Sequence, residues 1–212
     1  MIEPSSDVAF TPSVKAAQTR LGSREAYAQQ EANGGFRTEI TPDLVAFLAG
    51  IDTAFLATAS AAGQPYAQHR GGPPGFIRPL DANLLGFADY AGNRQYITTG
   101  NLAENDRAFL FLIDYSRPRR VKLWGHARMS DDAALIAGLM PDNYKARPER
   151  AILFEVAAWD INCPQHIARK VNLAEAHSML SARDARIRDL ETQLAEVRGR
   201  STANSLTEGA NT

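Results

Sequence analysis

The chain has 212 residues, of which 44% are hydrophobic and 22% charged, and its formal net charge at pH 7 is −1. This composition is ordinary for a soluble globular protein, so it excludes a fibrous or wholly disordered chain, and the charge excludes a nucleic-acid binder that works by bulk basicity. A single cysteine, no apolar run long enough to span a bilayer and an N-terminus without a signal-peptide pattern predict a cytoplasmic protein with no membrane or nucleic-acid partner.

The length favours one main domain with tails. Residues 1–40 are polar with scattered apolar positions, which predicts a loosely packed N-terminal arm, with a short helix over 23–30 as the alternative. The compact region begins at Thr41, where Thr41-Pro42-Asp43 supplies a helix cap, a proline at the first helical position and an acidic first turn. We expect this helix to end at Gly50.

Short apolar and β-forming segments follow, separated by turn residues. They cover residues 53–60, 64–69, 75–79, 83–88, 108–115, 119–129 and 151–157. Strands at this spacing predict a small antiparallel barrel. We expect the run 108–115 to be a strand buried throughout, and we expect helices over 94–105 and over 131–139, the latter capped by Ser130.

The tail carries a seven-residue repeat. With Leu173 at position a, apolar residues recur at a (Leu173, Leu180, Ile187, Leu194) and at d (Ala176, Leu190, Val197), and Arg183 is the one misfit. The pattern predicts either a coiled coil or a single long helix docked on the barrel over residues 171–199. Residues 200–212 are poor in apolar side chains and predict a disordered end.

Two segments have the composition of a phosphate site. His69 and Arg70 stand at a strand end beside Gly71 and Gly72, whose missing side chains let backbone amides approach a bound group. The sequence Asn93-Arg94-Gln95 follows Gly92 and opens the predicted helix, where unpaired N–H groups favour an anion. Together they predict two sides of a nucleotide site. No GxGxxG or GxxxxGK[ST] motif is present, so neither a dinucleotide-binding Rossmann fold nor a P-loop is expected.

The order of the motifs PYAQHRGG, GFADYAGNRQ and VKLWGHARM resembles the FMN-binding split barrels related to pyridoxamine 5′-phosphate oxidase. The CPQHI segment at 163–167 is similar to the branch described as predicted flavin-nucleotide-binding proteins. The resemblance covers residues 41–170. It implies a mainly β fold, a six-stranded antiparallel split barrel with flanking helices and a long C-terminal helix, and a homodimer that binds FMN at the subunit interface.

Carried over residue by residue, the resemblance implies a cofactor-binding set. Arg94 matches a phosphate-binding arginine, and Asn93 and Gln95 replace the serine and lysine beside it. For Trp124, a core or dimer-interface position is as consistent with the sequence as a flavin contact. The expected phosphate and ring-edge contacts are Gln68, His69, Arg70 and Gly71, and Ala88 and Asp89 are expected to make backbone contacts from the next strand. Arg120, Lys122 and Trp124 are expected to reach the flavin of the other subunit, and Gln165 and His166 are expected near the isoalloxazine ring.

The function implied is that of a flavin-dependent oxidoreductase that transfers hydride or electrons to or from an unknown small substrate. The family's Y-x-x-S-R-P-x-x-S stretch appears here as residues 144–151, with Tyr144 one place closer to the arginine and Ala151 in place of the final serine, so a substrate other than pyridoxamine phosphate is expected. The alternatives are a flavin, deazaflavin or haem carrier or sensor without turnover, and an interaction protein that has lost its cofactor. No catalytic side chain is identified, and the four histidines are too scattered for a metal site.

Overall fold

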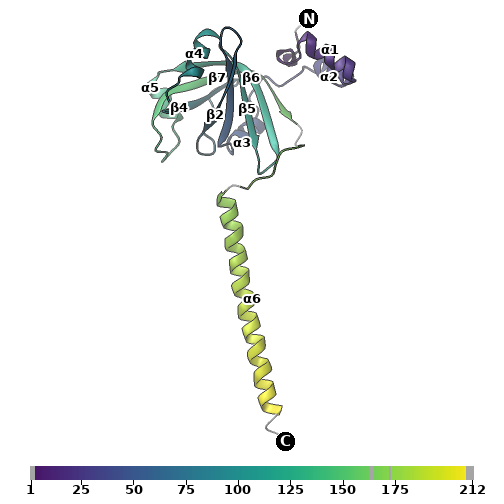
Figure 1. Ribbon diagram of the computed structural model, residues 1–212, viewed down its shortest axis with the longest axis vertical. Helices are drawn as coiled ribbons and strands as arrows, with labels where there is room; N and C mark the ends of the chain where they lie inside the picture. The colour runs from purple at the N-terminus through teal and green to yellow at the C-terminus, as the bar shows by residue number, and fades with distance from the viewer. Residues whose placement is uncertain (1–2, 163–164, 172, 209–212) are drawn as a thin grey trace. The chain divides into compact units, whose positions relative to one another are not determined.

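The computed structural model describes residues 3–162, 165–171 and 173–208, and the chain divides into two units, Met1–Ile167 and Ala168–Thr212. Among the described residues, one antiparallel sheet of seven strands forms the first unit, in the order β2-β1-β5-β6-β7-β4-β3. The sheet curls around a core (Figure 1), with β2 and β3 at its two edges, as a split barrel. The strands are β1 (Thr53–Ala59), β2 (Pro65–Gly71), β3 (Arg78–Pro79), β4 (Leu84–Tyr90), β5 (Arg107–Asp114), β6 (Arg119–Ser130) and β7 (Pro148–Asn162).

The mainly β fold and the antiparallel barrel are confirmed, but the implied count of six strands is wrong by one. The additional strand is β3, a two-residue edge strand that pairs only with Leu85 and Gly86 of β4. The last strand is also much longer than the apolar run 151–157 indicates. Its end extends because β6 pairs with it from Ser130↔Ala151 to Arg120↔Asn162, and its start extends because β4 pairs with Pro148 and Arg150.

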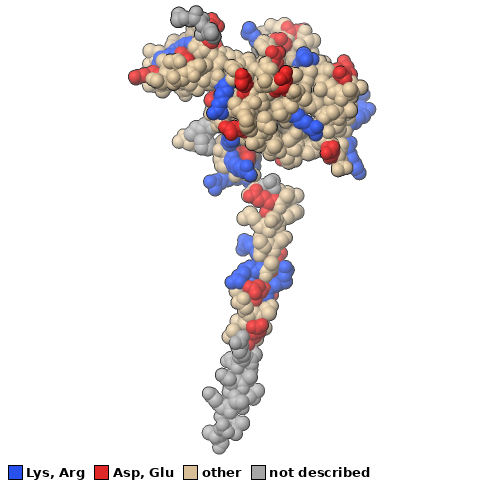
Figure 2. Space-filling view, turned by 180° about the vertical axis from the view of Figure 1, so that it is seen from behind, with Lys and Arg blue, Asp and Glu red and all other residues tan. Residues whose placement is uncertain are grey.

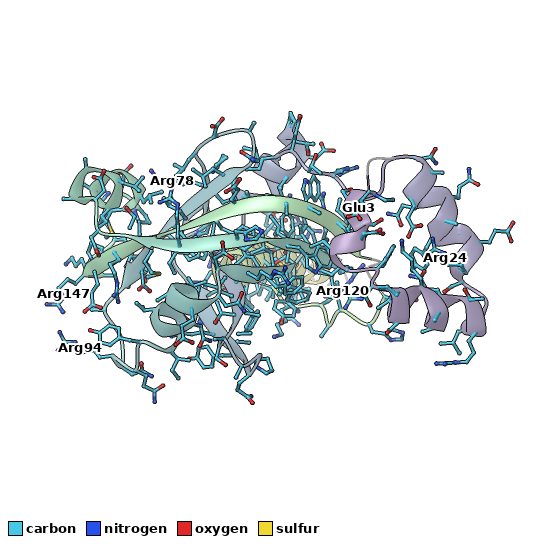
Figure 3. The ribbon with its side chains drawn as sticks, turned by 90° about the horizontal axis from the view of Figure 1, so that it is seen from above. Glu3, Arg24, Arg78, Arg94, Arg120 and Arg147 are labelled. Atoms are coloured by element: carbon cyan, nitrogen blue, oxygen red, sulfur yellow. The ribbon has the colours of Figure 1, made fainter. Side chains whose placement is uncertain are left out.

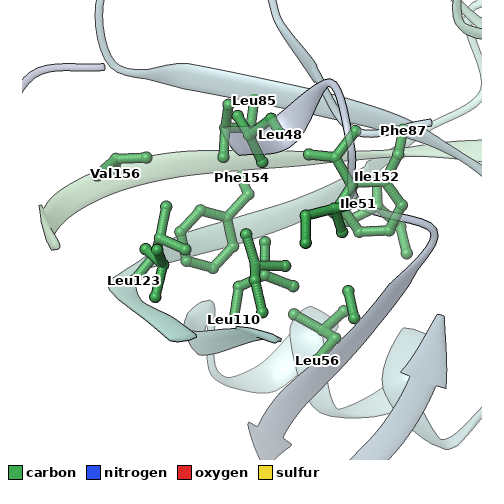
Figure 4. Close-up of a cluster of buried hydrophobic side chains, with 14 of the residues drawn as sticks. Leu48, Ile51, Leu56, Leu85, Phe87, Leu110, Leu123, Ile152, Phe154 and Val156 are labelled. Carbon is green, nitrogen blue, oxygen red and sulfur yellow. The ribbon is translucent and has the colours of Figure 1, made fainter. Parts of the chain in front are cut away.

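The core lies inside the curled sheet and under one short helix. Leu56, Leu110 and Leu123 alternate with outward-facing neighbours on β1, β5 and β6, and all three are fully buried. Figure 4 shows these side chains packed with Phe154 of β7 and with others from the helix end and β4. Burying a leucine of this kind stabilises the fold by about 1.5–3 kcal/mol.

The strand β5 is not buried throughout, as the run AFLFLIDY had indicated. Its residues alternate, so Phe109 and Phe111 face outward and are only half-buried. With Phe55 of β1 and Trp124 of β6 they form an aromatic surface, which we call the outer face. The apolar run is continuous because β5 has apolar side chains on both of its faces, the buried inner face and the half-buried outer face.

A register shift between Trp124 and Gly125 lets β6 bend around the barrel. At this position a Cβ on Gly125 would overlap the carbonyl oxygen of Glu155 on β7. Only glycine allows the two backbones to approach this closely.

The helices follow local capping signals, with two corrections. α3 (Pro42–Leu48) begins as expected, with the Thr41 hydroxyl accepting from the Leu44 N–H. α5 (Ala133–Leu139) is capped by Asp132 rather than Ser130, because the Asp132 carboxylate accepts from two backbone N–H groups of the first turn. α4 (Ile97–Glu104) begins three residues later than expected, after a loop.

The N-terminal arm is more ordered than its composition indicates. It contains a 3₁₀ turn (Ser5–Val8), α1 (Pro12–Leu21) and α2 (Arg24–Ala32); α2 corresponds to the alternative helix over 23–30. α1 has a cap at Thr11, Pro12 at its first position and left-handed Gly22 at its end. The arm joins the sheet at Arg37, because the N–H of Arg37 donates to the Trp159 carbonyl and the N–H of Trp159 donates to the Arg37 carbonyl.

In the second unit, α6 (Leu173–Glu208) is one continuous helix of 36 residues. The expected change from helix to disordered tail at Gly199 is therefore wrong up to Glu208, and the rest of that prediction, residues 209–212, lies outside the described residues. The segment contains no proline and its glycine costs only about 1 kcal/mol relative to alanine, so the helix can pass through it.

Charged residues of both signs are interspersed on the face of the molecule seen in Figure 2. Within the described ranges, no helix has the length and apolar character needed to cross a membrane.

Candidate functional site

A small hollow of about 50 Å³ lies where β2, β4, the start of β7 and the loop before α4 meet. Five of the residues expected to bind a cofactor line it: Gln68, Arg70, Asp89, Asn93 and Arg94. The strand period of two explains why Gln68 and Arg70 reach it together. His69 faces the other side of β2, where its ring meets the edge of Phe55 at 5.7 Å between centroids.

The Arg70 guanidinium is held in place at the base of this hollow. Its Nη1 lies 2.5 Å from Asp89 Oδ1, and Asp89 is 7% exposed. Its Nη2 donates to Gln68 Oε1 at 2.9 Å and to Thr98 Oγ1 at 3.1 Å. Contacts from three directions fix the plane of the guanidinium, so its remaining edge has a defined orientation.

Arg150 approaches the same carboxylate from β7, because Asp89 and Arg150 are cross-strand partners. Its Nη2 lies 3.8 Å from Asp89 Oδ2 and 3.8 Å from Glu149 Oε2. Its guanidinium also lies over the ring of Tyr96, 5.1 Å from the centroid. Asp89 thus sits between two arginines, which is a different role from the backbone contact that the resemblance implies for it.

Three buried hydrogen-bonding groups around the hollow have no partner among the described residues. They are the Nε of Arg70, the Nε of Arg150 and the hydroxyl of Tyr90. Burial raises the pKa of Tyr90 above its ordinary value, and the neighbouring Tyr144 raises it further, so the hydroxyl keeps its proton near neutral pH. An unsatisfied buried donor costs about 1–3 kcal/mol. The two arginines share Asp89, so a bound anion with several oxygen acceptors suits both of them, whereas Tyr90 packs on the α5 side of β4, near Tyr144 and Arg78.

The loop before α4 carries backbone strain. Arg94 has φ of 61° and Tyr96 has φ of 55°, in the left-handed region that side-chain-bearing residues seldom adopt. Arg94 therefore does not open a helix, as had been expected, and the N-terminus of α4 lies beyond it at Ile97. Strain of this kind persists where a surrounding structure or a ligand requires it.

Arg94 and Arg147 gather at the same end of the barrel (Figure 3). The Nε of Arg94 is 3.9 Å and the Nη2 of Arg147 is 3.4 Å from Glu149 Oε1. Both side chains are largely exposed, at 66% and 71%, so they can turn toward a ligand at the mouth of the hollow. Gln95 is exposed nearby, and its N–H donates to Asn93 Oδ1.

The remaining predicted residues lie elsewhere in this chain. Ala88 is buried in a small cluster with Leu139 and Ala151, and Gly71 packs against the His69 ring. Arg120 lies toward the N-terminal arm, far from Arg94 in Figure 3. Gln165 and His166 are exposed and do not line the hollow, while Cys163 and Pro164 of the same segment lie outside the described residues.

The ring of Trp124 already has contacts within its own chain. The ring of Phe36 from the arm stacks on it at 5.1 Å with an angle of 11°, and Lys122 lies 5.1 Å from its centroid on β6. Lys122 also pairs with Asp160 at 3.6 Å. Trp124, with His126, borders a cavity of about 470 Å³ between the arm and β5–β6. The packing alternative for Trp124 therefore has direct support.

Sequence reasoning missed Tyr90, Tyr96, Thr98 and Arg150 as lining residues. Thr98 and Tyr90 carried no motif, whereas Arg150 lay in the charged stretch ARPERA, where arginine beside a strand was a usable signal. Within the described part of the chain, no group of three or more His, Cys, Asp or Glu side chains is arranged to hold a metal ion.

Comparison with known proteins identifies a family for the chain. A family model described as pyridoxamine 5′-phosphate oxidase matches residues 40–163, whereas no curated protein matches the chain. Among solved structures, HupZ of Group A Streptococcus has a TM-score of 0.45 and 17% identity, over 62% of this chain and 99% of that one. A structure named a putative pyridoxamine 5′-phosphate oxidase from Lactobacillus delbrueckii also has a TM-score of 0.45, with 17% identity over 58% of this chain and 95% of its own. An FMN-binding protein from Syntrophomonas wolfei has a TM-score of 0.45 and 10% identity, over 71% and 95% of the two chains.

These solved structures share little sequence with the chain, and the assignment rests on the family model. The matched region runs from just before α3 through β7, so it contains the whole sheet and the hollow. It also spans more than half of the 212 residues. The chain therefore belongs to the pyridoxamine 5′-phosphate oxidase family.

Proposed function

We propose that the chain is an FMN-binding flavoprotein whose hollow receives the phosphate of the cofactor. The observation that carries the proposal is the convergence of Arg70 and Arg150 on Asp89, with the Nε groups of both arginines buried and without partners among the described residues. A phosphate group presents several strong acceptor oxygens and a charge of about −1.5 to −2, which suits such a set of donors.

The charges around the hollow favour an anion. Arg70, Arg94 and Arg150 line it together with the carboxylates Asp89 and Glu149, so the formal balance of the lining is +1. In this proposal Asp89 orients Arg70 and Arg150 without touching the cofactor, and Arg94 closes over the phosphate from the exposed side. The strained backbone at Arg94 and Tyr96 holds that side of the site in place.

The hollow has room for a phosphate but not for a whole flavin nucleotide. The rest of the cofactor must then lie along the surface of the barrel, where one chain offers few contacts. We therefore extend the proposal to a homodimer, in which Arg120, Lys122 and Trp124 of one chain approach the flavin held by the hollow of the other. The half-exposed aromatic residues of the outer face are suited to such an interface.

We further propose that the protein is an oxidoreductase acting on a small molecule. Bound flavin supplies hydride or electron transfer, while the protein contributes position and electrostatics. On the substrate side, Tyr144 meets Tyr90 edge-on at 5.3 Å between centroids, and Arg147 is exposed beside it in the sequence. This segment offers an aromatic edge and two exposed cations, Lys145 and Arg147, a combination that suits a small, negatively charged substrate.

The experiment that tests the phosphate site compares FMN with riboflavin, which lacks the phosphate. Visible absorption titration of the full chain should show about one FMN per chain. Replacing both Arg70 and Arg150 by alanine should weaken FMN binding by at least about 100-fold, since each charged hydrogen bond contributes about 1.5–3 kcal/mol. Riboflavin affinity should change little.

The matched control is Arg128→Ala, which removes an exposed arginine from β6. It should leave both affinities unchanged. Equal losses for FMN and riboflavin in the double variant would mean that the arginines maintain the fold rather than bind phosphate. A wild-type chain that takes up no flavin would end the proposal.

A further inference from the structure

The helix α6 carries a narrow apolar stripe along most of its length. At about 1.5 Å per residue its 36 residues extend for about 54 Å. The side chains of the stripe are between 46% and 71% exposed on the helix: Leu173, Leu180, Ile187, Leu190, Leu194 and Val197. Long helices are stabilised mainly by packing an apolar face, so this stripe requires a partner.

The width and period of the stripe indicate what kind of partner fits it. Its residues repeat at positions a and d of a heptad, which is the seam of a coiled coil, whereas a helix docked on a globular domain needs a wider apolar face. Flanking position e carries His177, Asp184, Glu191 and Arg198, and position g carries Arg186, Gln193 and Arg200, with Met179 as the one apolar residue there. Charged flanks close to the seam disfavour burial against a broad surface.

We propose that α6 pairs in parallel and in register with α6 of a second copy of this chain, forming a two-stranded coiled coil. In that arrangement a g residue faces the e residue of the next heptad in the partner helix. Arg186 of each copy then faces Glu191 of the other, which gives two attractive pairs. Arg186 also contacts Asp189 on its own helix at 2.5 Å, so the new pair extends an existing charged network.

The antiparallel arrangement places like charges together. With the two stripes fully overlapped, Asp184 of each copy faces Glu191 of the other, and Arg186 faces Met179 and so has no acidic partner across the interface. Like-charge pairs of this kind destabilise the assembly. The charge pattern therefore selects the parallel orientation.

Arg183, the charged residue at a d position, is consistent with two strands rather than more. In a parallel pair the d side chain enters a hole that includes the neighbouring e position of the facing helix, which is Asp184. The long arginine can meet that carboxylate while its charged end reaches water. In a bundle of three or four helices the same position is more enclosed, and burying the charge costs more.

This pairing stands independently of flavin binding. A parallel coiled coil brings the two Leu173 ends together, and residues 168–172 connect each end to its own barrel unit. The two barrels would be linked at an effective concentration in the millimolar range, whichever surfaces they use to contact each other.

Disulfide trapping in the full chain tests the proposal. In a Cys163→Ser background, Leu190→Cys places a cysteine at a d position, and Thr192→Cys places one two residues away on the outer side of the helix. Under mild oxidation at micromolar protein, Leu190→Cys should form a covalent dimer at least about tenfold faster than Thr192→Cys. Adding Ile187→Glu should abolish that difference.

Each other outcome contradicts the proposal in a specific way. Slow trapping at both positions would indicate that the stripe is covered by the chain's own barrel. Poor trapping of Leu190→Cys alone, with rapid trapping when it is mixed with Leu180→Cys, would indicate antiparallel helices. Equal, rapid trapping at both positions would indicate association without a defined seam.

A charge reversal checks the orientation separately. Glu191→Arg should slow trapping at Leu190→Cys about two- to fivefold, and Arg186→Glu should restore it when the two are combined, because the pair is re-formed with opposite signs. An antiparallel pair predicts the opposite sign, since Glu191→Arg would then relieve the repulsion with Asp184. Faster trapping in Glu191→Arg would overturn the proposal.

Discussion

The hollow around Arg70 and the outer face around Trp124 belong to the same sheet. They differ in whether their side chains have partners within the chain. In the hollow, the Nε groups of Arg70 and Arg150 are buried without partners among the described residues. On the outer face, the Trp124 ring is already stacked by Phe36 of the same chain. Unpaired buried donors beside a hollow fit an anionic ligand, whereas a filled aromatic contact is explained by packing alone. The single chain therefore supports Arg70 as a ligand contact more strongly than it supports Trp124.

The largest effect should come from removing the carboxylate that orients the two arginines. Asp89→Asn leaves the buried guanidinium group of Arg70 without its counter-charge and leaves Arg150 with Glu149 alone, which should destabilise the ligand-free chain by about 3 kcal/mol. Because the variant also loses a negative charge beside the hollow, added phosphate should recover more stability in it than in the wild type. Urea unfolding with and without inorganic phosphate measures both effects.

Asp160→Asn serves as the control on the other side of the barrel. Its carboxylate pairs with Lys122 at 3.6 Å and is about a third exposed, so its loss should cost less than about 1 kcal/mol. Phosphate should have no selective effect on it. If Asp89→Asn were as mild as this control, the hollow would not be the charge-sensitive region of the molecule.

On the outer face, the corresponding change is Phe36→Ala. Phe36 is 7% exposed and joins Phe10 of the arm to Trp124, so its removal should cost about 2 kcal/mol, less than a core phenylalanine because the arm can partly close the gap. Trypsin should then cut the arm at Arg24 faster, and tryptophan fluorescence, to which the buried Trp159 adds a constant part, should shift toward that of an exposed indole as Trp124 is uncovered. Leu21→Ala, at a position 77% exposed, should change neither.

Tyr90→Phe returns to the hollow with a smaller change. Removing a buried hydroxyl that lacks a partner should leave the ligand-free chain unchanged or about 1 kcal/mol more stable, while FMN affinity falls about five- to tenfold if the hydroxyl donates to the phosphate. Thermal unfolding and FMN titration of the same preparations separate the two. A loss of stability without a loss of affinity would remove Tyr90 from the site.

The raised pKa of Tyr90 adds a dependence on pH. Burial favours the neutral phenol in the folded chain, so this stabilising contribution is complete below the unfolded value near 10 and is lost as pH rises above it. The Tyr90→Phe variant should therefore lose less stability than the wild type above pH 10. Equal alkaline curves would show that Tyr90 is better solvated than its position indicates.

Local signals in the sequence were sufficient for the elements that depend on neighbouring residues. The cap at Thr41 predicted the start of α3, and strand alternation brought Gln68 and Arg70 to one side of β2. The arm shows the limit of the approach. Its helix α1 has the same kind of cap at Thr11 but few apolar residues, so composition outweighed the capping signal.

The parts of the hollow that were missed depend on contacts between distant segments. Arg150 reaches Asp89 only through the β4–β7 register, which no local pattern contains. The left-handed backbone at Arg94 and Tyr96 was equally hidden, because neither is a glycine. The expected contact between Trp124 and a flavin came from the family resemblance. Trp124 does not line the hollow of its own chain, so a contact with flavin bound there needs a second copy of the chain.

The smallest expected effect concerns the ion pairs that hold the arm together, far from the hollow. Glu31 accepts a hydrogen bond from Arg24 and pairs with Lys15 at 3.4 Å, and these contacts, that of Arg24 first, lower the pKa of Glu31. Because the folded value lies below the unfolded one, the stabilisation is complete above about pH 4.5 and is lost as pH falls through the folded pKa. The pKa of Lys15 is raised by Asp7, so that partner keeps its charge throughout this range.

Acid should therefore loosen the arm before it unfolds the barrel. Tryptophan fluorescence, followed from pH 6 to pH 3, should shift as Trp124 is uncovered, at a pH where far-UV circular dichroism still reports an intact sheet. In Glu31→Gln the shift should already be partly present at pH 6 and should change less on acidification, because the titrating group is gone. An identical transition in the variant would assign the acid sensitivity to other carboxylates and leave Phe36 as the main contact that keeps the arm on the outer face.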